Sequence, residues 1–236
     1  MFLCAGEGRR LRPLTLLYPK PLTAVAGVPL AVRQILALKR AGITEIVVNA
    51  AYGSRILEAE LGDGSRWGVK LLWSIEGRTG EEALETRGGI AKALPLLTAG
   101  GEDGGFIVAA GDIAADFDYG AIAERARGLD ASGDLAHLVM VPNPDFHPQG
   151  DFRLIDGRIA RKEKAGGEAL TYASIAAFHP ALFSGVDAGR AALFPWMFGA
   201  IDADRVSGEK FPGRWANVGT LEELARAEAM FEGDAA

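Results

Sequence analysis

The sequence predicts an α/β fold, built on a central, mostly parallel sheet with helices on both of its faces. Over the first 133 residues, short apolar segments alternate with segments in which apolar residues recur at helical spacing. Alternation at this spacing is typical of βαβ units, which form parallel sheets. The chain has 236 residues, of which 49% are hydrophobic, and this is enough for one domain with a substantial core.

The first half of the chain supplies the parallel strands and the helices that connect them. Ala31, Ile35 and Leu38 lie on one face of a helix, and Gly42 follows as a stop signal. Short apolar segments bounded by turn residues indicate buried strands. The expected strands are Phe2–Ala5, Ile46–Asn49, Val69–Ser74 and Phe106–Ala110, and the expected helices are Leu30–Arg40, Ser54–Leu61 and Gly89–Leu97.

After about residue 134 the pattern changes to strands joined by turns rich in Pro, Gly and Asp, with few helices between them. Such segments predict mixed or antiparallel strands that extend the same sheet. A helix over Leu221–Phe231 is expected to close the fold. The expected strands of this half are Ala136–Val141, Asp151–Ile155, Arg158–Arg161 and Tyr172–Phe178.

Composition excludes several classes of protein. No segment approaches about 18 consecutive apolar residues, and the N-terminus lacks the pattern of a signal peptide, so no membrane partner is expected. Cys4 is the single cysteine and cannot form an internal disulfide, which favours a cytoplasmic protein. The net charge of −6 argues against a nucleic-acid-binding protein. No pattern indicates an oligomeric state.

Charge is distributed unevenly along the chain. Residues 1–40 hold seven basic side chains and one acidic side chain, a local charge of +6, whereas the other 196 residues carry −12. Positive charge gathered at one end of an acidic protein indicates a bound anion, of which phosphate is the commonest.

A glycine-rich turn followed by basic residues forms the first candidate site. Gly6 and Gly8 come directly after the first expected strand, where glycine allows a sharp turn whose N–H groups can face a phosphate. Arg10 offers a planar fork of donors to phosphate oxygens, and Lys20, held between two prolines, offers a compact charge. This arrangement predicts a phosphate-binding loop.

The string Gly-x-Gly-x-Arg-Leu-x-Pro-Leu-Thr, followed by Pro-Lys-Pro, resembles the signature of the sugar-1-phosphate nucleotidyltransferases. The resemblance extends from Leu3 to about Glu228 and implies a Rossmann-like nucleotidyltransferase fold. It implies that Arg10 and the glycine loop hold a nucleoside triphosphate and that Lys20 contacts phosphate. The loop residues are Ala5, Gly6, Glu7 and Gly8.

Asp112 and Asn217 are the candidate metal ligands. Asp112 lies at the carboxyl end of an expected parallel strand, the ligand-binding edge of such a sheet, although by itself it could equally cap a turn. Together with the first motif it favours Mg²⁺, which takes one or two protein carboxylates. The segment Gly213–Thr220 resembles a family segment, Trp-x-Asp-Val-Gly-Thr, whose aspartate is the second magnesium ligand. Asn217 stands at that position, so weaker metal binding is expected.

Glu85 and Gly88 belong to a further candidate segment for the nucleotide. It resembles a Leu-Glu-Thr-Gly-Gly-Gly segment that contacts the nucleobase in relatives, and Gly111, just before Asp112, is assigned to the same nucleotide site. Arg87 stands where glycine is usual, and a positive φ there would strain an arginine. A different course of this loop is therefore expected.

The expected sugar-binding residues are Asn143, Asp151, Phe152 and Ser174. The region around them resembles the subgroup of N-acetylmuramate-1-phosphate uridylyltransferases, which serve peptidoglycan recycling. By residue type alone, Asn143 also suits a turn and Phe152 suits the core. Arg153 and His147 are the nearest basic candidates for the carboxylate of that sugar.

One nucleotidyltransferase domain is expected over residues 1–236. The resemblance divides it into a nucleotide-binding half over 1–133, a sugar-binding half over 134–220 and a C-terminal helix over 221–236. His137 is expected to pack within a strand and His179 to lie in a turn, and no histidine has a partner at metal-ligand spacing.

The implied reaction is attack by an oxygen of a sugar 1-phosphate on the α-phosphorus of a nucleoside triphosphate, UTP for this subgroup, with pyrophosphate leaving. A phosphate monoester with a second pKa near ~6 is largely ionised at pH 7, so no general base is needed. Arg10, Lys20 and Mg²⁺ on Asp112 are expected to align the two anions. Two alternatives remain: a mannose- or glucose-1-phosphate nucleotidyltransferase that uses GTP, UTP or dTTP, and a non-catalytic nucleotide-sugar sensor. The second is kept because Asn217 replaces an acid, although Arg10, Lys20 and Asp112 argue for activity.

Overall fold

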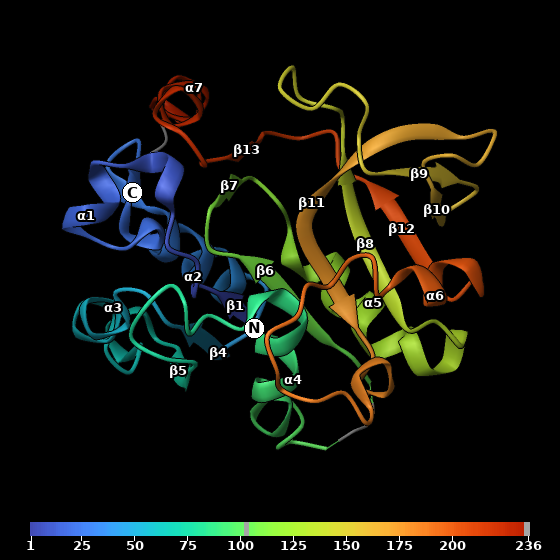
Figure 1. The fold of residues 1–236 in the computed structure, drawn as a ribbon, viewed down its shortest axis with the longest axis horizontal. Helices are drawn as coiled ribbons and strands as arrows, with labels where there is room; N and C mark the ends of the chain where they lie inside the picture. The colour runs from blue at the N-terminus through green and yellow to red at the C-terminus, as the bar shows by residue number, and fades with distance from the viewer. Residues whose placement is uncertain (102–103, 234–236) are drawn as a thin grey trace.

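A nine-stranded mixed sheet forms the centre of the computed structural model, which describes residues 1–101 and 104–233 (Figure 1). The strand order is β5-β4-β1-β6-β11-β8-β12-β10-β9. The strands are β1 (Phe2–Leu3), β4 (Glu45–Ala50), β5 (Lys70–Ile75), β6 (Phe106–Ala110), β8 (Ala136–Val141), β9 (Phe152–Ile155), β10 (Arg158–Arg161), β11 (Glu168–Phe178) and β12 (Val206–Lys210). The predicted α/β fold with a mixed central sheet is confirmed.

The first half of the chain builds the parallel part of the sheet. β1 pairs in parallel with β4 and β6, and β4 with β5. β11 lies antiparallel to both β6 and β8, and this makes the sheet mixed. The carboxyl ends of β1 and β6 therefore meet at one edge, where parallel sheets bind their ligands.

Helices cover both faces of the sheet and enclose two apolar cores. α2, α3 and α5 supply one core, and α4 and α6 supply the other. Alternation along β4 shows the division, since Ile46 and Val48 join the first core and Val47 joins the second. The helices are α1 (Leu14–Leu17), α2 (Leu30–Arg40), α3 (Ser54–Leu61), α4 (Glu85–Leu97), α5 (Tyr119–Ser132), α6 (Phe198–Asp202) and α7 (Leu221–Phe231), with 3₁₀ turns η1 (Arg9–Leu11), η2 (Lys20–Leu22), η3 (Ser65–Trp67) and η4 (Pro180–Phe183).

The C-terminal helix packs on the N-terminal segment, and Figure 1 shows α7 in red beside α1 in blue. Phe231 and Ala227 of α7 share a small core with Leu11 and Val25. Two short ribbons accompany this contact: β2 (Ala24–Val25) pairs with β3 (Val28–Pro29), and β7 (Ile113–Ala115) pairs with β13 (Trp215–Asn217). The C-terminal helix thus packs on the segment that follows β1.

Several elements differ from the predicted ones. α4 begins at Glu85 rather than Gly89, β11 begins at Glu168 rather than Tyr172, and α5 and β12 were not predicted. Residues 234–236 of the expected C-terminal segment lie outside the described residues. Within residues 1–101 and 104–233, no helix has both the length and the apolar character that crossing a bilayer requires.

Candidate functional site

A cavity of about 790 Å³ lies at the carboxyl ends of β1 and β6. The glycine loop and η2 form one side of it, and the start of α4 together with residues 190–194 forms another. Of the predicted nucleotide-site and catalytic residues, those that line the cavity are Ala5, Gly6, Glu7, Gly8, Lys20, Glu85, Gly111 and Asp112. The structure therefore brings most of the predicted nucleotide site to one place.

Lys20 and Asp112 form an ion pair in the wall of this cavity. Lys20 Nζ lies 2.7 Å from Asp112 Oδ2, and the two side chains are 11% and 32% exposed. Gly111, next to Asp112, donates its N–H to Leu3 O at 2.7 Å, and a Cβ at Gly111 would lie 2.5 Å from that oxygen. Close packing of β6 on β1 therefore fixes the Asp112 backbone relative to the glycine loop.

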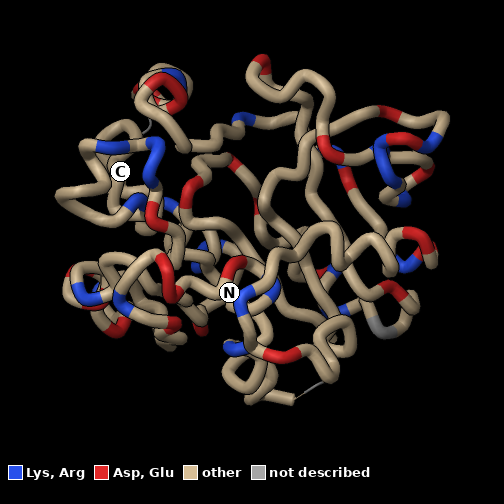
Figure 2. Tube along the Cα trace, viewed as in Figure 1, with Lys and Arg blue, Asp and Glu red and all other residues tan. Residues whose placement is uncertain are grey.

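The glycine loop is held by its own neighbours. Gly8 has φ +65°, and a Cβ there would lie 2.9 Å from Thr15 Cγ2. Thr15 Oγ1 donates to Gly8 O at 2.9 Å. Glu7 accepts from Arg9 at 2.7 Å and also pairs with Arg12, and basic residues gather near α1 in Figure 2. Glu7 thus offsets part of the positive charge around the loop.

Arg10 does not line the cavity. Its guanidinium lies beside Gly219, where a Cβ would come within 2.9 Å of Arg10 Nη2. Gly219 lies between β13 and α7, so Arg10 lies beside the turn that leads into the C-terminal helix. Of the three predicted catalytic residues, the structure brings together Lys20 and Asp112.

Asn217 lies on the strand next to Asp112 and has an unused oxygen. Val218 N donates to Asp112 O at 2.8 Å, and the β7–β13 register places Asn217 opposite Ile113. Among the described residues, Asn217 Oδ1 is buried without a hydrogen-bond partner, although no group of three or more His, Cys, Asp or Glu residues is placed to hold a metal. One carboxylate and one free amide oxygen fit a divalent cation that keeps most of its ligands from phosphate and water.

Cys4 lies in the same wall, but its thiol is unreactive. Burial, and secondarily the charge of Asp112, raises the pKa of its thiol well above the ordinary value. The thiol therefore stays neutral, and this argues against a nucleophilic role.

A second cavity of about 350 Å³ adjoins the first. The two share Tyr172, Ser174 and Phe194 in their walls. The predicted sugar-site residues Asp151, Phe152 and Ser174 line the second cavity, and so does Asn217. Tyr172 is a wall residue of both cavities that motif reasoning did not single out.

Asn143 stabilises a loop instead of lining either cavity. Its Nδ2 donates to Ala169 O at 3.0 Å, and its Oδ1 accepts from Thr171 Oγ1 at 2.9 Å. Asp151 accepts from Tyr172 N at 2.9 Å and lies 3.0 Å from His147 Nε2. The turn role that residue type allowed for Asn143 agrees with this placement.

Of the two basic candidates for a sugar carboxylate, His147 reaches the second cavity and Arg153 does not. Arg153 donates to Lys162 O at 3.2 Å and to Gly166 O at 3.0 Å. Its guanidinium therefore holds the turn between β10 and β11, whereas His147 lines the cavity.

The start of α4 differs from the expected loop. Glu85 has φ +59°, whereas Arg87 lies inside the helix and avoids the strain that its position suggested. The Arg87 guanidinium lies over the Trp196 ring, with its carbon 5.4 Å from the ring centroid. Gly88 does not line the cavity, because its Cα packs against Gly189, whose oxygen would lie 2.2 Å from a Cβ.

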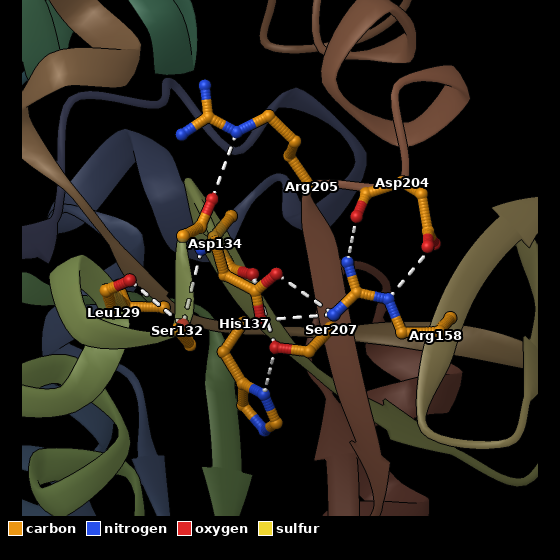
Figure 3. Close-up of polar contacts among 10 residues, drawn as sticks. Leu129, Ser132, Asp134, His137, Arg158, Asp204, Arg205 and Ser207 are labelled. Carbon is orange, nitrogen blue, oxygen red and sulfur yellow. Dashed lines mark hydrogen bonds and ion pairs between the residues drawn. The ribbon is translucent and has the colours of Figure 1, made fainter.

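A polar cluster formed by His137 of β8 with Ser207 and Glu209 of β12 lies outside the walls of both cavities. His137 is 3% exposed, its Nδ1 lies 2.9 Å from Ser207 Oγ, and its Nε2 lies 3.8 Å from Glu209 Oε2. Figure 3 shows His137 and Ser207 close to Arg158, which is paired with Asp134 and Asp204. The predicted packing of His137 within a strand is confirmed.

Glu209 gives this cluster a pH dependence. Its side-chain contact with the His137 imidazole, followed by the charges of His137 and Arg125, lowers the pKa of the Glu209 carboxyl below its ordinary value of 4.5 although burial opposes the shift. The carboxylate therefore contributes stability above that value, and the contribution is lost as the pH falls through the folded pKa.

We expect Glu209→Gln to lower the free energy of unfolding by less than about 1 kcal/mol near pH 6 and to have no effect near pH 3. Chemical denaturation of both proteins at the two pH values measures this difference. An equal cost at both pH values would contradict the assignment of the pKa shift to the folded state.

Comparison with known proteins gives three findings. Residues 1–151 match the model of the nucleotidyl transferase family. The chain is 45% identical over 231 residues to an N-acetylmuramate alpha-1-phosphate uridylyltransferase of Neisseria meningitidis serogroup B, covering 98% of this chain and 96% of that protein. It is also 38% identical over 120 residues, half of this chain and 32% of the relative, to mannose-1-phosphate guanyltransferase beta-B of Xenopus laevis.

A solved structure agrees with the fold. A crystal structure of a Bacillus anthracis protein assigned as a glucose-1-phosphate thymidylyltransferase superposes with a TM-score of 0.83 at 18% identity. The match covers 100% of this chain and 95% of that chain.

Proposed function

The chain belongs to the nucleotidyl transferase family, and we propose that it transfers UMP from UTP to N-acetylmuramate 1-phosphate, releasing pyrophosphate. The observation that carries the proposal is the end-to-end likeness to the Neisseria meningitidis protein, 45% identical over 98% of this chain and 96% of that one. The two adjoining cavities support it, because their combined space suits a nucleotide beside a sugar phosphate.

In this reaction a phosphate oxygen of the sugar attacks the α-phosphorus of UTP. A new P–O bond forms, the bond to the β-phosphate oxygen breaks, and its electron pair leaves with pyrophosphate. The phosphate monoester is already ionised near neutral pH, so no side chain has to remove a proton. The work that remains for the protein is to align two anions and to stabilise the charge on the leaving group.

Residues of the first cavity align the anions and stabilise the charge on the leaving group. The loop around Gly8 lines the first cavity, and its backbone N–H groups bind the triphosphate in this proposal. Lys20 supplies a positive charge in the wall of the first cavity, beside Asp112. Ser174 and Tyr172, which line both cavities, mark the boundary between nucleotide and sugar.

Asp112 and Asn217 hold a divalent cation, Mg²⁺, in this proposal. The unpartnered Oδ1 of Asn217 and the hydrogen bond from Val218 N to Asp112 O, which joins the two backbone segments, support the assignment. When bound, the ion supplies positive charge to the triphosphate. Asn217 adds no charge of its own, so the protein contributes a single carboxylate to the ion.

We expect Asn217→Asp to tighten the binding of Mn²⁺, used as a spectroscopic substitute for Mg²⁺, by about tenfold, because an added carboxylate strengthens attraction to the ion. Asn217→Ala is expected to weaken binding instead. Electron paramagnetic resonance titration without substrates measures both. Equal Mn²⁺ affinity in the three proteins would rule out Asn217 as a ligand.

A substrate screen tests the proposed activity. Pyrophosphate release is measured for ATP, GTP, UTP and dTTP with N-acetylmuramate, mannose and glucose 1-phosphates, with and without Mg²⁺. We expect the highest kcat/KM for UTP with N-acetylmuramate 1-phosphate. A preference for GTP with mannose 1-phosphate favours the guanyltransferase alternative, which the likeness to the Xenopus laevis protein supports. Tight binding of a nucleotide sugar without turnover of any pair favours a sensor.

A further inference from the structure

Residues 189–194, here called the strap, cross the beginning of α4 and form one wall of the first cavity. Ala191 O accepts from Arg87 N at 3.0 Å and Gly88 N at 3.2 Å, and Ala191 N donates to Leu84 O at 2.9 Å. The missing side chain of Gly88 lets the strap approach closely. These contacts fix the strap backbone on both sides of Arg190.

Arg190 adds a positive charge to the lining of the first cavity, from the strap rather than from the N-terminal segment. The basic residues that line the two cavities, within the part of the chain that the structure describes, are Arg9, Lys20, His147 and Arg190. Arg9 and Lys20 both come from the N-terminal segment and lie 2.7 Å from their acidic partners. Arg190 is the single guanidinium of the two walls that comes from elsewhere in the chain.

The partner of Arg190 holds it loosely. Arg190 Nε lies 3.3 Å from Glu85 Oε1, and the two side chains are 57% and 45% exposed. An exposed pair at this distance contributes little to stability, so another anion can displace Glu85 at low cost. Phe194 and Leu193 of the same strap continue the wall, and Phe194 also lines the second cavity.

We propose that Arg190 binds an anionic group of the sugar phosphate, exchanging Glu85 for it; this inference rests on the proposed function. The two substrates are both anions, and the N-terminal segment provides positive charge to the nucleotide. The strap provides the second positive charge, on the wall that leads to the second cavity. A guanidinium suits this role, because its planar fork binds phosphate or carboxylate through two hydrogen bonds.

Steady-state kinetics of Arg190→Met test the inference. We expect the KM for N-acetylmuramate 1-phosphate to rise about 10- to 100-fold, the range for losing a charged hydrogen bond, while the KM for UTP changes less than about twofold. Arg190→Lys is expected to recover part of the loss. Arg226→Met is the matched control, because Arg226 pairs with Glu222 on the exposed surface of α7; its kinetics should equal those of the unmodified protein.

Two competitive inhibitors identify the anionic group. N-acetylglucosamine 1-phosphate carries the phosphate without the carboxylate, and N-acetylmuramate carries the carboxylate without the phosphate. The inhibitor whose inhibition constant rises in Arg190→Met contains the group that Arg190 binds, and either result supports the inference.

An unchanged KM for the sugar phosphate, or an equal rise in both KM values, would overturn it. Glu85→Gln separates a structural role from binding: if it reproduces the Arg190→Met kinetics, the ion pair itself matters and the inference fails. Absence of pyrophosphate release by the unmodified protein with every substrate pair would instead refute the proposed function.

Discussion

Lys20→Ala is expected to lower kcat/KM for pyrophosphate release by about 100- to 1,000-fold, the range for removing one preorganised charge from the transition state of a group transfer. Lys20 is the most enclosed positive charge in the cavity, with an 11% exposed side chain 2.7 Å from Asp112. Pro19 and Pro21 flank Lys20 in its short turn, η2, so the ammonium loses little freedom on binding phosphate. A continuous pyrophosphate assay with UTP and the sugar phosphate measures the loss.

Lys70→Ala is the matched control, because Lys70 forms an exposed ion pair with Glu45 3.0 Å away. The pair lies at the amino ends of β5 and β4, whereas the cavity lies at the carboxyl ends of the parallel strands β1 and β6. The variant should retain full activity.

Asp112→Ala is expected to lower kcat/KM as much as Lys20→Ala does. The double variant should lose no more activity than either single variant, because the effects of groups that act together are not additive. Full activity in either single variant would remove the basis of the proposed mechanism.

The parallel half of the fold could be predicted because its signals are local. The apolar segments of β4 and β6 and the helical periodicity of α2 give their positions within a residue or two. α5 was not predicted because its sequence carries a weak helical signal. Ala123 and Ala126 contribute only small side chains to its buried face, and Gly120 and Gly128 have low helix propensity. β12 escaped because Ser, Gly, Glu and Lys follow its first valine, and its neighbours β8 and β10 make it a strand.

The candidate site also contains residues with a local sequence signal and residues whose place depends on tertiary contacts. Gly8, Lys20 and Asp112 follow short linear motifs, and the structure places them in one wall. Arg190 belongs to a loop without periodicity, and only its pairing with α4 brings it to the cavity. Gly88 has a sequence signal, but the reason for that glycine is tertiary, since it makes room for the strap. Linear motifs therefore predicted the residues on the glycine-loop side of the cavity, whereas the place of Arg190 depends on contacts between distant segments.

Gly111→Ala is expected to be strongly destabilising, because the added methyl group meets backbone. The new Cβ would lie 2.5 Å from Leu3 O, 3.0 Å from Cys4 Sγ and 3.2 Å from Pro21 Cγ. The nearest atom is backbone of the neighbouring strand and cannot rotate away, so β6 and β1 must separate. Overpacking of this kind costs about 2–3 kcal/mol, and in a chain of this size the melting temperature should fall by about 5–10 °C.

Gly128→Ala isolates the packing contribution of that change. Gly128 lies in α5, and a Cβ there would meet no atom within 4 Å beyond its chain neighbours and the backbone of its own helix. Both substitutions reduce the entropy of the unfolded chain to the same extent, and this alone stabilises by about 0.4–1 kcal/mol. Gly128→Ala should therefore raise the melting temperature while Gly111→Ala lowers it.

Because separation of β6 from β1 also moves Asp112 away from Lys20, Gly111→Ala should lose pyrophosphate release even at temperatures where it stays folded. A Gly111→Ala protein with unchanged melting temperature and activity would show that the contact between the two strand ends does not position Asp112.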